Sequence, residues 1–202
     1  MAKIKLTKTE LKKQQDSLRQ YRRFLPTLQL KKQQLQLEIR QSRERLEENR
    51  RRREELVHEL RDWVALFGDT GTLEWMINSL RLVKVEKGRL NIAGVMVPTF
   101  TEAVFDQTAP DLLNTPWYTD EALIALKESV GLRAAGRIIE EQERLLSIEL
   151  RTTSQRVNLF EKVKIPECRE NIRRIRIQIG DQETAAVARS KIAKKKSAEV
   201  AS

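Results

Sequence analysis

The sequence predicts a mainly α-helical protein, a long antiparallel two-helix coiled coil with a short central insert containing a β-hairpin. Two observations predict this fold. Aromatic residues make up only 5% of the 202 residues and charged residues 34%, which argues against a large globular core. The apolar residues, 40% of the chain, recur at heptad spacing in both outer parts of the sequence but not in its middle.

Four segments follow from this pattern. We expect residues 1–67 to form an N-terminal coiled-coil helix, 68–118 a central insert with a β-hairpin and a short helix, 119–190 a C-terminal coiled-coil helix, and 191–202 a basic flexible tail. Two helices that each expose an apolar stripe bury it most simply by folding back on one another, which places both chain ends together.

The N-terminal helix is predicted from apolar steps of three and four residues. Thr7 and Glu10 form a capping-box pair at its start, and Gly68 is its stop signal, so it would extend over about 90 Å. Pro26 lacks an N–H, and a kink or break is expected there. The apolar seam positions are Leu11, Leu18, Tyr21, Leu25, Leu28, Leu35, Ile39, Leu46, Leu56, Leu60, Trp63 and Phe67, and the polar ones are Lys32, Ser42, Asn49 and Arg53.

The central insert carries strand signals. Apolar and polar residues alternate on both sides of residues 86–89, Glu-Lys-Gly-Arg, which we interpret as the turn of the β-hairpin. Pro110 and Pro116 then mark a loop. The alternating apolar residues are Val83, Val85, Leu90 and Ile92.

The C-terminal helix is predicted to begin at Thr119, because Asp120 and Glu121 place negative charge at the positive end of the helix dipole. Pro166 should bend it. The Lys-rich tail after residue 190 should fray. The seam positions are Leu123, Leu126, Val130, Ile138, Leu145, Ile148, Leu159, Val163, Ile172, Ile175 and Ile179.

The formal charge of +10 is unevenly distributed. Residues 1–60 hold 17 Lys and Arg against 9 Asp and Glu, residues 61–120 hold 5 against 8, and residues 121–202 hold 17 against 12. Two basic arms therefore flank an acidic middle, a distribution that suits nucleic acid, an anionic membrane surface or an acidic protein. A coiled-coil nucleic-acid binder and a membrane-tethering adaptor are thus two alternatives to a protein-binding role.

The residues that carry chemistry argue against an enzyme. The sequence has no Walker loop, no GxGxxG motif and no cluster of metal ligands, so we expect no catalytic, cofactor or metal site. His58 lies among charged residues, and Cys168, the single cysteine, excludes an internal disulfide. No apolar run approaches the roughly 20 residues of a membrane span. The start of the chain lacks the apolar core of a signal peptide, and we expect a soluble, cytoplasmic chain without direct membrane insertion.

Three motifs add a family resemblance. Residues 152–161, Thr-Thr-Ser-Gln-Arg-Val-Asn-Leu-Phe-Glu, followed by Ile165 and Pro166, are similar to the pattern T-x-R-R-V-N-A-L-E with a following I-P in the D subunit of the V-type and A-type ATPases. Residues 91–98, Asn-Ile-Ala-Gly-Val-Met-Val-Pro, resemble that family's N-x-x-G-V-x-V-P, and residues 6–11 resemble its opening. The matching positions, with Gln155 in place of an Arg, are Thr152, Gln155, Arg156, Val157, Asn158, Glu161, Pro166, Asn91, Gly94, Val95 and Pro98.

The chain departs from the family pattern at three positions. Gln155 stands where the family usually has Arg, Phe160 breaks the A-L-E order, and Pro26 falls in a normally uninterrupted helix. These differences concern details of the helices rather than the resemblance, which spans the beginning, middle and end of the chain in the right order.

The resemblance implies a non-catalytic central-stalk subunit that transmits torque between ATP turnover and ion translocation in the membrane. Its implied partners are a hexameric ring of catalytic A and regulatory B subunits, the F subunit and the membrane-ring adaptor of C or d type, which would make the chain peripheral to the membrane. Residues 1–25 and 175–202 would lie in the ring and residues 68–118 outside it, nearer the F subunit. The candidate ring contacts are Arg22, Arg23, Arg50, Arg51, Arg52 and Arg53.

Overall fold

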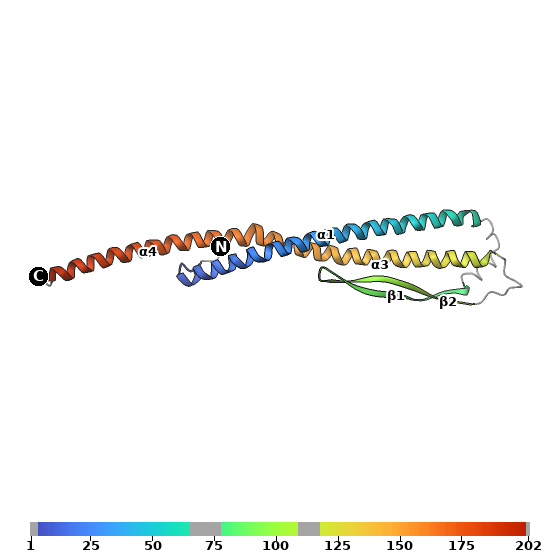
Figure 1. Cartoon of the computed structure of the whole chain (residues 1–202), viewed down its shortest axis with the longest axis horizontal. Helices are drawn as coiled ribbons and strands as arrows, with labels where there is room; N and C mark the ends of the chain where they lie inside the picture. Colours follow the sequence, from blue (N-terminus) through green and yellow to red (C-terminus); the bar gives the residue numbers. More distant parts are fainter. Residues whose placement is uncertain (1–3, 65–77, 109–117, 201–202) are drawn as a thin grey trace. The chain divides into compact units, whose positions relative to one another are not determined.

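The computed structural model describes residues 4–64, 78–108 and 118–200 and confirms the predicted fold class (Figure 1). A long helix stands at each end of the sequence and an antiparallel β-hairpin in its middle. Phe67, Gly68 and the loop prolines lie outside the described residues. In chain order the elements are α1 (Lys8–Val64), β1 (Leu80–Ile92), β2 (Val95–Gln107), α3 (Thr119–Asn158), the π-helix η2 (Leu159–Lys164) and α4 (Ile165–Val200).

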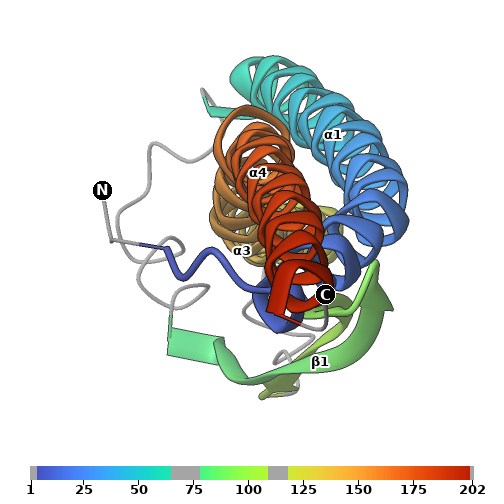
Figure 2. The same ribbon diagram turned by 90° about the vertical axis from the view of Figure 1, so that its left-hand side faces the viewer.

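The chain divides into two compact units. We call residues 1–32 and 152–202 the terminal unit and residues 33–151 the hairpin unit. In the terminal unit, Lys8 Nζ lies 2.9 Å from a Glu183 carboxylate oxygen, and Tyr21 stacks on Phe160. As the residue number along α1 rises from 8 to 21, the number of the residue that it contacts falls from 183 to 160, so the start of α1 runs antiparallel to α4. The two lie side by side in the views of Figures 1 and 2.

The hairpin unit repeats this antiparallel pairing between α1 and α3. Arg43 Nε donates to Glu143 at 2.6 Å, and Arg52 Nη2 lies 3.0 Å from Glu128. The helix pairs therefore run in the predicted direction in both units.

Local signals set the two predicted helix starts. Thr7 Oγ1 accepts a hydrogen bond from the Glu10 N–H at 3.3 Å and α1 begins at the next residue, as the capping pair predicts. Helix α3 begins at Thr119 with Asp120 and Glu121 in its first turn. The break expected at Pro26 was wrong, since α1 continues through it. Pro26 is exposed, so the carbonyl that it leaves unpaired lies on the solvent face.

The seam between the helices is narrow. On α1, Leu35, Ile39, Leu56 and the polar Ser42 are buried, as predicted. In the predicted C-terminal helix, which the structure divides into α3, η2 and α4, the assignment of three residues to the seam was wrong. Ile148 is 54% exposed because its neighbour Leu146 takes the buried position. The other two, Leu159 and Val163, lie in η2 and are 44% and 49% exposed.

The turn of the β-hairpin lies at Ala93 and Gly94, and the prediction of a turn at residues 86–89 was wrong. Both turn residues have positive φ, 50° and 83°, as two-residue type I′ turns require. Asn91 Oδ1 accepts a hydrogen bond from the Gly94 N–H at 2.9 Å and fixes the turn. Gly88 instead pairs with Thr99 in mid-strand, where an added Cβ would lie 2.5 Å from the Thr99 hydroxyl oxygen.

Figure 1 shows the hairpin beside α3, and a cluster of buried side chains joins it to both helices of its unit. Val97, 1% exposed, forms one buried cluster with Leu35 and Ile39 of α1 and Leu146 of α3. Gln142 of α3 donates a hydrogen bond from Nε2 to the Pro98 carbonyl oxygen, so the hairpin backbone is also held by a polar contact. The hairpin thus adds a third layer to the helix pair.

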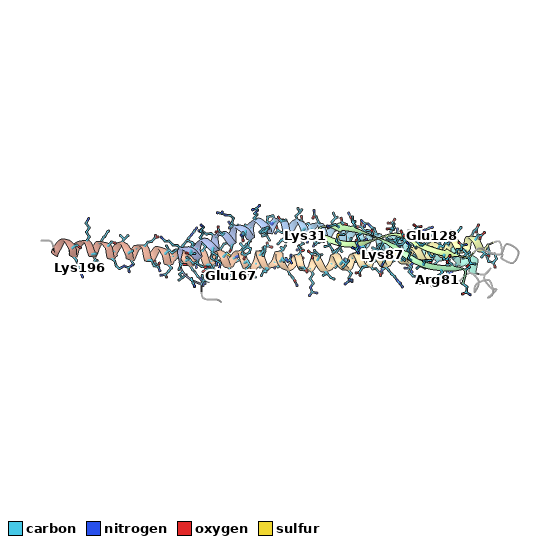
Figure 3. All side chains as sticks on the ribbon, turned by 90° about the horizontal axis from the view of Figure 1, so that it is seen from below. Lys31, Arg81, Lys87, Glu128, Glu167 and Lys196 are labelled. Carbon is cyan, nitrogen blue, oxygen red and sulfur yellow. The ribbon has the colours of Figure 1, made fainter. Side chains whose placement is uncertain are left out.

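Helix α4 ends at Val200, ten residues past the predicted end at residue 190. All described side chains from Gly180 to Ser197 are exposed, and Figure 3 shows Lys196 on this stretch. An Ala- and Lys-rich composition has high helix propensity, and the Ser190 hydroxyl donates back to the Ala186 carbonyl at 3.0 Å. This part of α4 therefore forms a helix without burying an apolar face. The flexibility of the tail stays a prediction.

Val97→Ala tests the docking of the hairpin. Because it empties a buried position between two helices, we expect the free energy of unfolding to fall by about 1–3 kcal/mol. The control is Met96→Ala, whose side chain is 56% exposed and which should change stability by less than about 0.5 kcal/mol. Urea denaturation followed by circular dichroism would contradict this packing if the two variants lost equal stability.

Two glycines of α3 provide a second test. Nothing lies within 4 Å of a Cβ added at Gly131, so Gly131→Ala should stabilise the protein by about 0.5–1 kcal/mol through helix propensity. A Cβ at Gly136 would lie 3.0 Å from Asn49 Oδ1, a buried oxygen without a hydrogen-bond partner, so Gly136→Ala alone should bring no gain. Adding Asn49→Ala to Gly136→Ala should recover the gain. Thermal melts that show equal gains for both single variants would contradict this contact.

Candidate functional site

A π-helix lies within the first family motif. In η2, Leu159–Lys164, the chain makes a wider turn, and the Ile165 N–H donates to the Phe160 carbonyl, five residues back. Pro166 follows at once and explains the position of the turn. A proline inside an α-helix cannot bond the carbonyl four residues back, here that of Lys162, and its ring clashes with that carbonyl. The structure thus places a π-helix directly before Pro166, where the sequence predicted a bend.

The π-helix also keeps the apolar seam continuous. Buried positions on one face of a coiled coil recur every seven residues, but the step from buried Val157 to buried Ile165 is eight. A π turn accommodates one extra residue, so both side chains face the same partner helix. After η2 the steps of three and four resume at Cys168, Ile172 and Ile175, all buried.

The first motif joins a packed face to an exposed one. Of the positions that match the family pattern, Val157 is buried, Thr152 is half-buried, and the other five are exposed; Thr153 and Ile165, within the same stretch, are buried. Phe160, a departure from the family pattern, stacks on Tyr21 of α1 with ring centroids 5.0 Å apart and planes tilted by 46°. The exposed motif residues, which are open to a partner, are Gln155, Arg156, Asn158, Glu161 and Pro166.

The second motif has a structural role in the hairpin. Asn91 and Gly94 make its turn, and half-buried Val95 packs against the cluster around Val97. Pro98 offers its carbonyl to Gln142. The four predicted residues therefore position the hairpin on α1 and α3.

The Arg50–Arg53 run lies on α1 of the hairpin unit, where acids of the same chain meet two of its members. Arg52 donates from Nε to Glu128 at 3.1 Å, and this hydrogen bond, with the charges of Glu128, Glu59 and Glu55, raises the pKa of Arg52. Arg50 lies 3.9 Å from Glu140. Arg51 is exposed and Arg53 half-buried. Half of this predicted contact surface is thus engaged in ion pairs between helices.

Arg22 has a different environment in the terminal unit. It lines a groove of about 820 Å³ between α1 and α4, whereas Arg23 is exposed outside it. Four more arginines line this groove and were not predicted as a site. Their spacing could have shown that the arginines of each helix share one face, since residues three, four and seven apart do so, but not that the two faces line one groove. We define the arginine groove by its lining residues, Gln15, Leu18, Arg19, Arg22, Arg169, Ile172, Arg173, Arg176 and Ile177.

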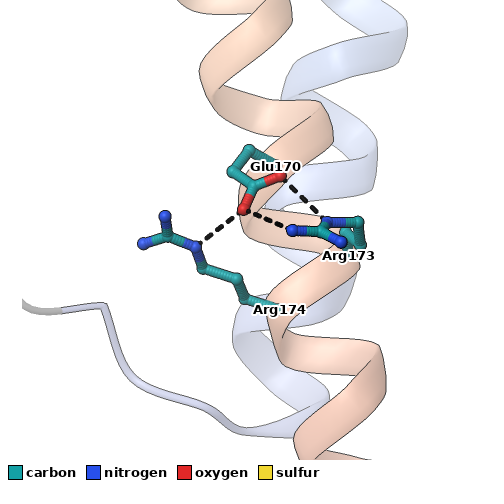
Figure 4. A network of polar contacts seen from close by, with 3 residues as sticks. All are labelled: Glu170, Arg173 and Arg174. Carbon is teal, nitrogen blue, oxygen red and sulfur yellow. Dashed lines mark hydrogen bonds and ion pairs between the residues drawn. The ribbon is translucent and has the colours of Figure 1, made fainter.

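Positive charge concentrates in the terminal unit. It holds 22 Lys and Arg against 8 Asp and Glu, a formal charge of +14, whereas the hairpin unit holds 17 against 21, a charge of −4. Glu170 binds both Arg173 and Arg174, with Nε–oxygen distances of 3.0 and 2.9 Å (Figure 4). The hydrogen bonds from Arg173 and then Arg174 lower the pKa of Glu170.

The described residues include one histidine, His58, and one cysteine, Cys168. They contain no group of three or more His, Cys, Asp or Glu placed to hold a metal ion. None of the helices in the described ranges is both long enough and apolar enough to cross a membrane. Cys168 is 6% exposed, and burial raises the pKa of its thiol, which favours the unreactive protonated form.

Changing the length of η2 tests its role in the seam. Deleting Lys162 together with Pro166→Ala shortens the step between Val157 and Ile165 to seven, so we expect a regular α-helix of at least equal melting temperature. Inserting one alanine after Lys162 turns the following seam by about 100° and should lower the free energy of unfolding by about 3 kcal/mol or more.

Deletion of Gln20 from α1 is the control for η2. It shifts a seam that has no π turn and should destabilise the protein about as much as the insertion. Circular dichroism melts in which all three length changes cost the same stability would show that η2 does not absorb an extra residue.

Comparison with known proteins agrees with the motifs. The profile of the family described as the D subunit of ATP synthase matches residues 10–195. The V-type ATP synthase D subunit of Borreliella burgdorferi is 44% identical over 194 residues, covering 96% of this chain and 95% of that protein. The V-type ATP synthase D subunit of Chlamydia felis is 34% identical over 195 residues, covering 96% and 94%. The chain therefore belongs to the family of ATP synthase D subunits.

Proposed function

We propose that this chain is the central-stalk rotor shaft of a V/A-type rotary ATPase and has no catalytic role of its own. It transmits torque between ATP hydrolysis or synthesis in a ring of A and B subunits and ion translocation in the membrane. The observation that carries this proposal is the family match over residues 10–195, which includes nearly every described helix and strand. The names of the relatives place those proteins in a V-type ATP synthase.

The helices suit the transmission of torque. Helix α1 is continuous over 57 residues, although Pro26 removes one of its backbone hydrogen bonds. It contributes to both units, so a rotation applied to one unit is passed to the other through a continuous helical backbone. Within the hairpin unit, ion pairs such as Arg43–Glu143 and the docked hairpin join the helices laterally. These contacts oppose sliding of one helix along the other.

The charge distribution supports an arrangement of the partners. We assign the A/B ring to the terminal unit, with residues 1–25 and 175–202 inside the ring. The F subunit and the C- or d-type adaptor then meet the remainder of the chain, with residues 68–118 nearer the F subunit. The assembled chain is cytoplasmic and peripheral to the membrane. Arg22 and Arg23 are better ring contacts than Arg50 and Arg52, which already have acidic partners within the chain.

Co-expression with the A, B and F subunits of the same source tests the proposal. We expect the chain to co-elute in gel filtration with an A/B hexamer at one copy per hexamer. We also expect ATP turnover that depends on the chain, because the shaft couples successive catalytic sites. A chain that stays apart from a well-formed hexamer would overturn the shaft assignment.

A further inference from the structure

We propose that the arginine groove of the terminal unit is the docking site for an acidic amphipathic helix of an A or B subunit. This inference rests on the proposed function, because it names the part of the shaft surface and the partner chemistry that join there. Helices α1 and α4 form the two walls. Leu18 and the buried Ile172 lie between them, and Ile177, 55% exposed, extends the apolar strip. Arginines stand on both walls.

Four of the five arginines that line the groove have no acidic partner in the described part of the chain, and the fifth, Arg173, is bound by Glu170. Among the residues that the structure describes, no carboxylate pairs with Arg19, Arg22, Arg169 or Arg176. The nearby acids of α4 are engaged elsewhere, since Glu167 lies 3.3 Å from Lys164 and Glu170 binds Arg173 and Arg174. Like charges held along one groove repel each other, and an anionic partner would remove this repulsion.

The shape of the charge pattern selects the kind of anion. Arg169, Arg173 and Arg176 lie on one face of α4 and span about 10 Å along its axis. A single phosphate would reach only part of this span. A helix with carboxylates spaced over two turns would meet arginines on both walls, and its apolar stripe would cover the strip between them.

The groove does not have the features of a nucleic-acid site. Its lining contains no aromatic side chain on which a base could stack. The apolar strip between the arginine rows would stay uncovered beneath a phosphate backbone. An amphipathic helix uses both parts of the groove.

Zero-length cross-linking in the assembled complex tests the contact. Arg22→Lys and Arg176→Lys each keep the positive charge and add an amine that carbodiimide couples to a carboxylate in direct contact. We expect mass spectrometry to find links from both positions to Asp or Glu of an A or B subunit. The control Arg52→Lys should link to Glu128 of the same chain, 3.0 Å from Arg52. If the control links while positions 22 and 176 give no link to A or B, the groove is not the docking site.

Charge reversal gives an independent measurement. In the full chain, Arg22→Glu with Arg176→Glu should weaken binding to the A/B hexamer roughly 10- to 100-fold at low salt, and less as the salt concentration rises. The control pair Arg40→Glu with Arg137→Glu makes the same charge change at exposed positions of the hairpin unit and should weaken binding less than about threefold.

The outcomes separate the two proposals. Failure of the unaltered chain to bind the hexamer overturns the shaft assignment itself. Binding by the unaltered chain, with equal losses for both charge-reversed pairs, overturns only the groove. Duplex DNA that binds through Arg22 and Arg176 and competes with the hexamer would also overturn the assignment of the groove to a protein helix.

Discussion

The burial of a narrow apolar seam between antiparallel helices is the constraint on which the rest of this structure depends. The chain has few aromatic residues, and its buried positions form single files along α1, α3 and α4 rather than a broad core. Because each row of buried side chains is only one residue wide, an extra or missing residue in a regular helix would turn the following apolar side chains away from the partner helix. The π-helix η2 keeps Val157 and Ile165 in one file, and the hairpin is held where Val97 reaches the file between Leu35 and Leu146.

The charged residues beside the seam have different partners in the two units. In the hairpin unit, arginines of α1 meet glutamates of α3, so the basic residues serve the folding of the chain itself. In the terminal unit, basic residues far outnumber acids and several arginines have no acidic partner among the described residues. A run of arginines in the sequence therefore does not by itself predict a binding site, because the residues on the facing helix decide whether those arginines are paired. In the hairpin unit such arginines form ion pairs within the chain, and in the terminal unit several have no acidic partner among the described residues.

The sequence was sufficient to predict an element wherever the interaction that determines the element lies within a few residues. The starts of α1 and α3 follow from Thr7 and Thr119 with the acids that come after them, because caps act within a single turn. The hairpin turn was misplaced because Gly88 resembles a turn residue, whereas its need for glycine comes from Thr99 on the opposite strand. Leu159 and Val163 were misassigned because a heptad was continued through a π turn. The arginine groove could not be found from one helix, since its walls come from residues about 150 positions apart.

The exposed end of α4 has a consequence for the chain before assembly. Val187 and Ile192 are more than half exposed, and no side chain from Gly180 to Ser197 is covered. An isolated helix of this length is only marginally stable in water, so its backbone amides should exchange with solvent far faster than those beside Ile172 or Ile175. Proteases should also cut there first. Slower exchange of these amides would therefore report that another molecule covers this part of α4.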